Sequence, residues 1–208
     1  DILQTEFPKD IDLVIHLAGL SGVRKSLDNP TEYWKQNCIV SQRLFENFKD
    51  TKIIYASSST AAEPWRNPYA MSKFSLEQIA EPYDSLGLRF TTVYGRGAPE
   101  TMLIPKILNN NIEYLNTNHS RDFIHVEDVL DAITTVMDTD LRGVIDVGTG
   151  QTNLLSEIVS RFQIEYTPVI GDEHEREDNL ANTDVLQSYG WEAKTNIYDY
   201  IEEHRNVN

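Results

Sequence analysis

The chain has 208 residues, 40% of them hydrophobic, which is enough to form a core in one domain or in one domain with a small lobe. Its formal net charge of −15 argues against nucleic acids and anionic membranes as partners. Its apolar runs are too short for a membrane span, which needs ~20 residues. The single cysteine, Cys38, excludes an internal disulfide and predicts a cytoplasmic protein.

The first part of the chain alternates between strand and helix patterns. Residues 12–17 form a short apolar run with β-branched side chains, which is typical of a buried parallel strand. A helix is predicted from about Pro30, with Asp28 or Asn29 as the N-cap and proline at the first helical position. Cys38 lies among the apolar positions of this helix and is expected to fill the core.

The alternation continues downstream. Residues 52–56 predict a second strand, a helix containing Tyr69 is predicted to run to about Leu86, and residues 88–93 predict a third strand. Strands that alternate with helices predict an α/β fold, here a Rossmann-like, doubly wound parallel sheet with helices on both faces.

Three segments fall at the carboxyl ends of the predicted strands, at positions 16–19, 57–59 and 91–92. Ligands of open α/β sheets bind beyond the carboxyl ends of the strands. We therefore expect these three segments to line one cleft.

Two of these segments suggest a chemistry. Ser58 closes the second strand, and Tyr69 and Lys73 are four residues apart on the next helix. A free phenol, with a pKa of about 10, is a poor base at neutral pH. A lysine at i+4 lies on the same helix face and stabilises the phenolate. Tyr69 then becomes a candidate general acid and base for hydride exchange at a sugar alcohol, with Ser58 hydrogen-bonding the reacting oxygen.

A Tyr-x-x-x-Lys spacing alone is a weak signal, because a chain with 10 tyrosines produces it by chance. The order of the elements strengthens it. An apolar strand, a serine run and a short loop with proline come before Tyr69, and the helix then begins. This setting favours a functional role for Tyr69 and Lys73.

Several motifs in the same order resemble the extended short-chain dehydrogenases/reductases, the NAD-dependent epimerase/dehydratase family of nucleotide-sugar enzymes. The resemblance runs from about residue 1 to 203 and is greatest to UDP-hexose 4-epimerases. The motifs are His-Leu-Ala-Gly-Leu at 16–20, Asn-Pro at 29–30 with Asn37, the serines at 57–59, Tyr69 to Lys73, Leu-Arg-Phe at 88–90 with Tyr-Gly at 94–95, Arg-Asp-Phe-Ile-His-Val-Glu-Asp-Val at 121–129, Val-Gly-Thr-Gly at 147–150 and Tyr-Gly-Trp at 189–191.

The resemblance implies that NAD is the cofactor and assigns it a set of contacts. The expected cofactor-binding residues are Asp1, Ile2, Leu17, Ala18, Gly19, Asn37, Tyr69 and Lys73. Asp1 would meet the adenine, and the small residues after the first strand would let the dinucleotide approach the backbone. Asn37 would hydrogen-bond a neighbouring loop beside the cofactor.

The resemblance also implies a nucleotide-sugar substrate. Its expected ligands are Ser58, Thr92, Leu103, Arg121 and Arg176. The two arginines would grip the pyrophosphate, a task suited to a planar fork of donors. No metal site is expected, because the run Asp-Glu-His-Glu at 172–175 is better explained as an acidic, solvated loop.

The chain also departs from the family pattern. The glycine-rich turn that opens the family's dinucleotide fold is absent, so the parent protein is expected to continue upstream. Residues 1–95, with part of 121–150, are predicted to belong to the NAD-binding domain, and residues 96–208 mainly to a substrate-binding lobe. Thr91 and Thr92 replace the family's Phe-Asn, and Arg176 begins Arg-Glu-Asp-Asn in place of Arg-x-Gly-Asp.

The residues after Ser58 limit the types of reaction that the site could catalyse. Family dehydratases carry an Asp-Glu pair there, whereas this chain has Ser59 and Thr60. Simple hydride removal and return at the sugar 4-position remains, which predicts an NAD-dependent nucleotide-sugar epimerase. Two alternatives stay open: an NAD(P)-dependent reductase of a nucleotide-linked keto-sugar, and a catalytically silent sensor of dinucleotide or sugar nucleotide.

The resemblance finally implies a homodimer. Family members pair through two helices, which here are the predicted helices at 30–48 and 69–86. Apolar residues spread around the first of these helices beyond one narrow stripe, as a helix with a second buried face requires.

Overall fold

The computed structural model describes residues 2–171 and 173–205, so Asp1 and Asp172 lie outside the described residues. The chain forms two compact units. Unit 1 is Asp1–Phe90 with Val136–Asp146, and unit 2 is Thr91–Thr135 with Val147–Asn208. Within the described part of the chain, no helix is long and apolar enough to cross a membrane.

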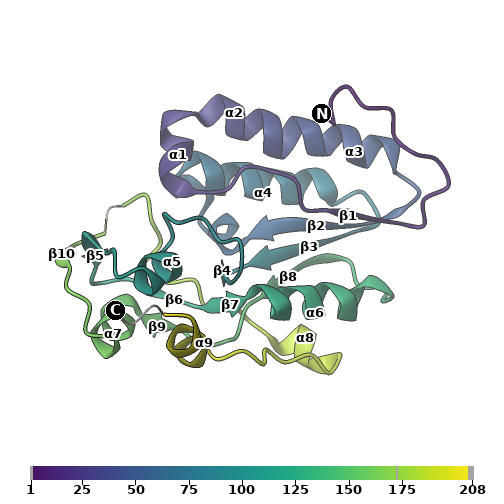
Figure 1. The fold of residues 1–208 in the computed structure, drawn as a ribbon. Coiled ribbons are helices and arrows are strands. Elements are labelled where there is room, and N and C mark those ends of the chain that lie inside the picture. The colour runs from purple at the N-terminus through teal and green to yellow at the C-terminus, as the bar shows by residue number, and fades with distance from the viewer. Residues whose placement is uncertain (1, 172, 206–208) are drawn as a thin grey trace. The chain divides into compact units, whose positions relative to one another are not determined.

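Unit 1 is built on a four-stranded parallel sheet (Figure 1). Its strands, in spatial order, are β1 (Leu13–His16), β2 (Lys52–Ser58), β3 (Ser85–Phe90) and β8 (Gly143–Val147). In the register of the sheet, His16 lies opposite Tyr55, and Ser58 lies opposite Phe90. The predicted α/β fold with a parallel sheet is confirmed.

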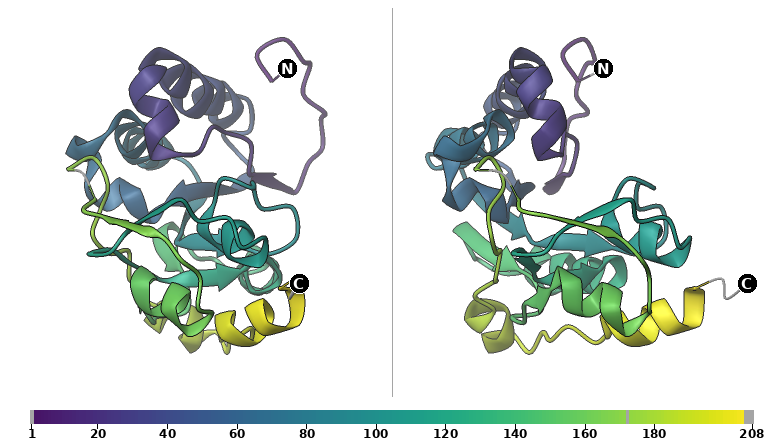
Figure 2. Two further views of the ribbon diagram at one scale, coloured as in Figure 1. Left: turned by 60° about the vertical axis from the view of Figure 1, so that its left-hand side comes forward. Right: turned by 90° about the vertical axis from the view of Figure 1, so that its left-hand side faces the viewer.

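Unit 1 also contains helical segments, the last of which contacts β2 and β3. They are α1 (Val23–Asp28), α2 (Pro30–Trp34), a π-helical segment (Lys35–Ile39), α3 (Val40–Asn47) and α4 (Pro68–Ala80). From α2 to α3 the chain is one continuous helix, because the π segment joins them directly. Figures 1 and 2 show α4 beside this long helix, and both contact each other along their lengths.

The start of α4 follows from its sequence. Asn67 is the N-cap, and its Oδ1 accepts a hydrogen bond of 2.8 Å from the amide of Ala70. Pro68 occupies the first helical position, where the missing amide costs nothing and the fixed φ suits the helix. The buried residues Leu76 and Ala80 then pack against Phe45 and Tyr55 in the core of the unit.

The end of α4 differs from the sequence prediction. The helix ends at Ala80 instead of about Leu86, and Leu86 is a fully buried residue of β3. Pro82 explains the early end, since proline has no amide to donate and its ring clashes with the carbonyl of the preceding turn. The prediction for residues 88–93 was also too simple, because β3 ends at Phe90 and Thr92 begins a separate strand.

Unit 2 has three small two-stranded sheets. They are β4 (Thr92–Tyr94) parallel to β7 (Phe123–His125), β5 (Tyr114–Asn116) parallel to β10 (Thr167–Val169), and β6 (Ser120–Arg121) antiparallel to β9 (Asn153–Leu154). Its helices are α5 (Leu103–Leu108), α6 (Val126–Met137, which runs into unit 1), α7 (Leu155–Arg161), α8 (Asp184–Ser188) and α9 (Ile197–His204).

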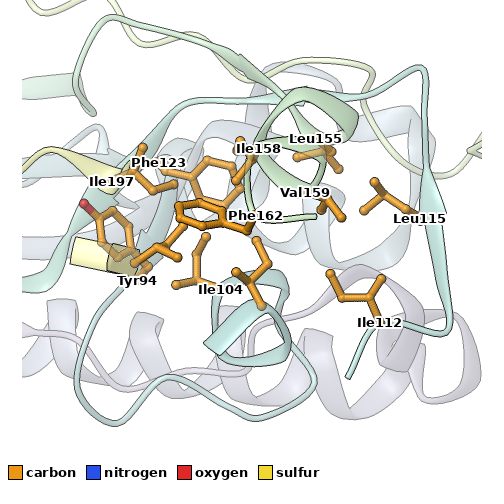
Figure 3. Close-up of a cluster of buried hydrophobic side chains, with 12 residues drawn as sticks. Tyr94, Ile104, Ile112, Leu115, Phe123, Leu155, Ile158, Val159, Phe162 and Ile197 are labelled. Atoms are coloured by element: carbon orange, nitrogen blue, oxygen red, sulfur yellow. The ribbon is translucent and has the colours of Figure 1, made fainter. Parts of the chain in front are cut away.

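The core of unit 2 joins residues that are distant in the sequence (Figure 3). Ile107 on α5 and Ile158 on α7 are fully buried, and Phe123 on β7 and Ile201 on α9 pack in the same cluster. This core fixes the short strands β6 and β7, and therefore the backbone around Arg121.

Candidate active site

The site in unit 1 begins at the carboxyl end of β2. Ser58 is the last residue of that strand, and its side chain caps the 3₁₀ turn that follows. The Ser58 Oγ accepts hydrogen bonds from the Thr60 amide at 3.3 Å and from the Thr60 hydroxyl at 2.9 Å. It is also hydrogen-bonded to the phenol of Tyr69, the second residue of α4. The structure therefore brings together the predicted hydroxyl pair, Ser58 and Tyr69.

The phenol of Tyr69 lies in a buried environment, with 9% of the residue exposed. Burial raises the pKa of Tyr69, the hydrogen bond from Ser58 lowers it, and the neighbouring Tyr33 raises it. The Tyr33 and Tyr69 rings meet edge to face at a centroid distance of 6.0 Å. Tyr69 is therefore a protonated phenol at neutral pH, and it can act as a base only when a positive charge offsets the cost of burial.

Lys73 supplies a positive charge on the same face of α4, one turn after Tyr69. Its Nζ donates a hydrogen bond of 2.8 Å to the carbonyl of Ala56 on β2. Burial lowers the pKa of Lys73 to about 8, while negative charge on Cys38 or Glu77 would raise it. Since the ammonium is directed at Ala56, burial is the main influence on the pKa of Tyr69 in this structure.

Asn37 links the loop after β1 to the catalytic helix. Its Oδ1 accepts a hydrogen bond of 2.7 Å from the Leu20 amide, and its Nδ2 donates to the Leu20 carbonyl at 3.0 Å. The same Nδ2 also donates to the Ser72 hydroxyl at 2.9 Å, next to Lys73. Asn37 lies in the π-helical segment, a local widening that is frequent at functional sites.

Gly19 lies against this arrangement. A Cβ at Gly19 would stand 2.8 Å from the Asn37 Oδ1 and 3.5 Å from the Lys73 Nζ, so only glycine fits without displacing them. An open pocket of about 260 Å³ adjoins it. The residues that line this pocket are Ile2, Ala18, Gly19, Gln36 and Val40. Ile2, Ala18 and Gly19 were predicted cofactor ligands, and Leu17 beside them is half-exposed.

Sequence reasoning missed Gln36 and Val40 as lining residues of this pocket. They are four residues apart and so share one face of the helix that carries Asn37. That spacing, read together with Asn37, was the available signal. Asp1, the other predicted cofactor ligand, lies outside the described residues.

Unit 2 holds Arg121 in a largely buried position, with 18% of its side chain exposed. Its Nη1 donates to the carbonyls of Ser120 at 2.7 Å and Glu177 at 3.0 Å. Its Nη2 is 3.2 Å from the His119 Nδ1 and 3.9 Å from a Glu175 carboxylate oxygen. Burial lowers the pKa of Arg121, and the Glu175 carboxylate raises it.

The other predicted substrate ligands, apart from Ser58 in unit 1, also lie in unit 2. The Thr92 hydroxyl accepts a hydrogen bond of 3.1 Å from the Asn179 Nδ2. Arg176 lies 3.9 Å from the Asp178 carboxylate, and Leu103 begins α5 at the margin of the core. Among residues 2–171 and 173–205, no group of three or more His, Cys, Asp or Glu side chains is placed to hold a metal ion.

Comparison with known proteins identifies the family of this chain. Residues 2–148 match the model of the NAD dependent epimerase/dehydratase family. The chain belongs to that family. This confirms the resemblance drawn from the motifs, and distant relatives carry the name UDP-glucose 4-epimerase.

Relatives of this family member include two proteins of Methanocaldococcus jannaschii. An uncharacterised one is 35% identical over 169 aligned residues, which cover 67% of this chain and 52% of that protein. A putative UDP-glucose 4-epimerase is 28% identical and is matched over 93% of this chain and 76% of its own length. Because the chain spans about half the length of the first relative, the activity, substrates and partners of the whole protein remain proposals.

Among solved structures, a similar one is UDP-glucuronic acid 4-epimerase from Bacillus cereus in complex with UDP-glucuronic acid and NAD. It superimposes with a TM-score of 0.86, at 23% identity, over 99% of this chain and 79% of that one. At this identity the likeness establishes the fold of the epimerase/dehydratase family member.

Proposed function

We propose that the protein is an NAD-dependent nucleotide-sugar epimerase that removes hydride from the sugar 4-position and returns it to the opposite face. The observation that carries this proposal is the hydrogen-bonded pair of Ser58 and Tyr69, with Lys73 one helical turn further along α4. A hydroxyl, a phenol and an ammonium in this order are the groups needed to move one proton from a secondary alcohol.

The residues of unit 1 fit NAD on structural grounds. Gly19 lines an open pocket together with Ile2 and Ala18, so the backbone at the end of this strand is accessible to a ligand. Ile2, Leu17, Ala18 and Gly19 would hold the dinucleotide along this edge, and Asn37 would fix the loop beneath it. When bound, NAD supplies the acceptor and donor of the hydride.

The side chains of unit 1 would transfer the proton of the reacting hydroxyl. Tyr69 would take the proton of the sugar 4-hydroxyl and later return it, and Ser58 would hold the reacting oxygen by a hydrogen bond. Lys73 would supply the charge that makes the phenolate accessible, since burial alone raises the pKa of Tyr69. Ser59 and Thr60 have no carboxylate for water elimination, which favours epimerisation over dehydration.

Unit 2 would supply ligands for the nucleotide. Arg121 and Arg176 would pair with the pyrophosphate oxygens, and Thr92 and Leu103 would contact the substrate. We propose on this basis that unit 1 belongs to a doubly wound, Rossmann-like NAD-binding domain and that unit 2 is mainly a substrate-binding lobe. Short-range contacts are required, because a chain of net charge −15 gives an anionic substrate no long-range attraction.

The experiment is turnover of a panel of UDP-sugars by the complete protein, read by NMR. Wild-type protein is expected to interconvert one 4-epimer pair, and Tyr69→Phe is expected to lower turnover by about 10²-fold or more with an unchanged circular dichroism spectrum. Equal turnover of both proteins would remove Tyr69 from the mechanism. Consumption of NADH or NADPH without an epimer would indicate the reductase, and ligand binding without turnover would indicate the sensor.

We also propose that the protein is a homodimer that pairs through α2, α3 and α4. Trp34 on α2, Ile39 at the end of the π-helical segment and Met71 on α4 expose 46%, 48% and 41% of their surface, and a partner helix would cover these apolar side chains. Light scattering of the complete protein should give twice the chain mass. Ile39→Glu should give monomer, whereas Gln42→Glu, an exposed control on α3, should not.

A further inference from the structure

Glu77 is a buried carboxylate that the proposed proton transfer does not use. It lies on α4 with 5% of its surface exposed, one turn after Lys73 and two turns after Tyr69. Residues at i, i+4 and i+8 share a helix face, so a phenol, an ammonium and a carboxylate follow one another along α4.

The carboxylate of Glu77 is bound from two strands. Arg89 on β3 donates two parallel hydrogen bonds, from Nε at 2.8 Å and from Nη2 at 2.7 Å. Ser57 on β2 donates from its hydroxyl to the Glu77 Oε1 at 2.5 Å. Ser57 directly precedes Ser58, so this carboxylate ties the end of the strand that presents Ser58 to the helix that presents Tyr69 and Lys73.

We propose that Glu77 is a positioning residue for this site, which fixes the end of β2 against α4 and supplies the negative charge that keeps Lys73 in its ammonium form. This inference rests on the proposed function, because it gives Glu77 a role in proton transfer through Lys73. It extends that function by one residue outside the Ser58, Tyr69 and Lys73 group.

The groups around Lys73 support a role for Glu77 in its charge. His16 on β1 is neutral at pH 7, because burial and the Lys73 charge lower its pKa to about 4. Burial raises the pKa of Cys38 to about 11, so this thiol is still neutral where Lys73 titrates, near 8. The Ala56 carbonyl adds a neutral acceptor. The formal negative charge facing Lys73 in this group is that of Glu77.

Groups around Glu77 itself oppose and support its charge. Arg89 pairs with it directly, and the Tyr55 phenol on β2 is held neutral at pH 7 by burial and by the Glu77 charge, which raise its pKa. Asp146 on β8 also acts on Arg89 and raises the pKa of that guanidinium together with Glu77. The Arg89 guanidinium therefore interacts with two carboxylates. It does not fully neutralise the negative charge of Glu77, which still acts on Lys73.

The test is the titration of Lys73 by NMR in complete protein carrying ¹³C-labelled lysine, with Lys73→Met to assign the signal. Glu77→Gln should move the Lys73 midpoint to lower pH by roughly half a unit or more. Glu81→Gln is the matched control, an exposed glutamate at the end of the same helix that loses the same charge. It should leave the midpoint unchanged.

Kinetics give a second readout. In Glu77→Gln, the alkaline limb of the pH profile should move to lower pH, and kcat at pH 8.5 should fall about threefold or more with KM changed less than twofold. If this variant fails to fold because Arg89 is left unpaired, Glu77→Gln with Arg89→Met removes both charges and carries the test. The Lys73 midpoint of that double variant should lie below that of Arg89→Met alone, because the two proteins differ only in the Glu77 charge.

A wild-type Lys73 midpoint in Glu77→Gln, or equal midpoints in the double variant and in Arg89→Met, would overturn the inference and leave Glu77 only as a partner for Arg89. The NMR titration needs no turnover. If the wild-type protein epimerises no nucleotide sugar, the proposed function fails, while the Lys73 midpoint still decides the role of Glu77.

Discussion

Both units bury charged side chains, but they satisfy them differently. In unit 2, the fully buried Asp122 carboxylate accepts hydrogen bonds from the amides of Thr149, Gly150 and Ala181 and from the Thr149 hydroxyl, at 2.8 to 3.3 Å. Asp128 similarly accepts the amides of Lys194 and Thr195, both at 3.0 Å. These carboxylates join distant loops.

In unit 1, the buried Glu77 carboxylate is paired with Arg89, but the buried charge of Lys73 is less well compensated. Lys73 donates to one carbonyl, that of Ala56, and burial lowers its pKa to about 8. A charged group that the fold disfavours is retained at a cost in stability, which is the pattern of a functional site. The comparison separates two carboxylates of unit 2 that hold loops together from the Lys73 ammonium of unit 1, for which we propose a functional role.

The largest effect on stability should come from Asp122→Ala. Three amides would lose their acceptor in a buried site, and each unsatisfied donor costs about 1–3 kcal/mol. We expect the free energy of unfolding to fall by about 3 kcal/mol or more in chemical denaturation. Asp140→Ala, which removes the same charge at an exposed position, should change it little. Equal stability of the two variants would show that Asp122 does not join these loops.

Lys73→Met should act in the opposite direction. Because the pKa of Lys73 falls from 10.5 to about 8 on folding, the folded state binds this proton less tightly than the unfolded state. The free-energy cost of burying the Lys73 ammonium is fully present below pH 8 and is relieved as the pH rises toward 10.5. At about 1.36 kcal/mol per pH unit, the variant should be more stable at pH 7 by on the order of 1–3 kcal/mol, and the gain should vanish above pH 10.5.

Denaturation at several pH values measures this difference. Lys49→Met, an exposed lysine after α3, is the control and should show no such gain. If Lys73→Met were less stable than wild type at pH 7, Lys73 would stabilise the fold. The buried charges of the two units would then not differ in their effect on stability.

His16 should produce a smaller effect in acid. Its Nε2 is 2.8 Å from the Ser41 hydroxyl, and burial with the Lys73 charge lowers its pKa from 6.5 to about 4. The unfolded state therefore binds the proton first, and stability falls as the pH drops from 6.5 toward 4. We expect His16→Gln to remove about 2 kcal/mol of the loss between pH 7 and 5. An unchanged pH dependence in the variant would place His16 in contact with water.

The sequence carried the local features of unit 1. The first two strands, the proline that begins α2 and the order of Ser58, Tyr69 and Lys73 follow from periodicity and turn chemistry, and the structure pairs Ser58 with Tyr69. The predicted helix end at Leu86 is wrong, because α4 ends at Ala80, two residues before Pro82. The short helix α1 was not predicted.

Features that depend on tertiary contacts could not be predicted from the sequence. Glu77, Arg89 and Ser57 come from three elements, and only folding shows that they share one hydrogen-bonded cluster. The close approach of Gly19 to Asn37 is of the same kind. The π-helical widening around Asn37 leaves no mark in a periodic apolar pattern.

The central claim is that this family member removes one hydride from a sugar carbon and returns the same hydride. The direct measurement uses a UDP-sugar carrying deuterium at the 4-position, incubated with the complete protein in ordinary water and followed by NMR and mass spectrometry. The account predicts a 4-epimer that keeps its deuterium, together with loss of the reaction in Tyr69→Phe. Deuterium replaced by solvent hydrogen, or no conversion of any sugar in the panel, would contradict it.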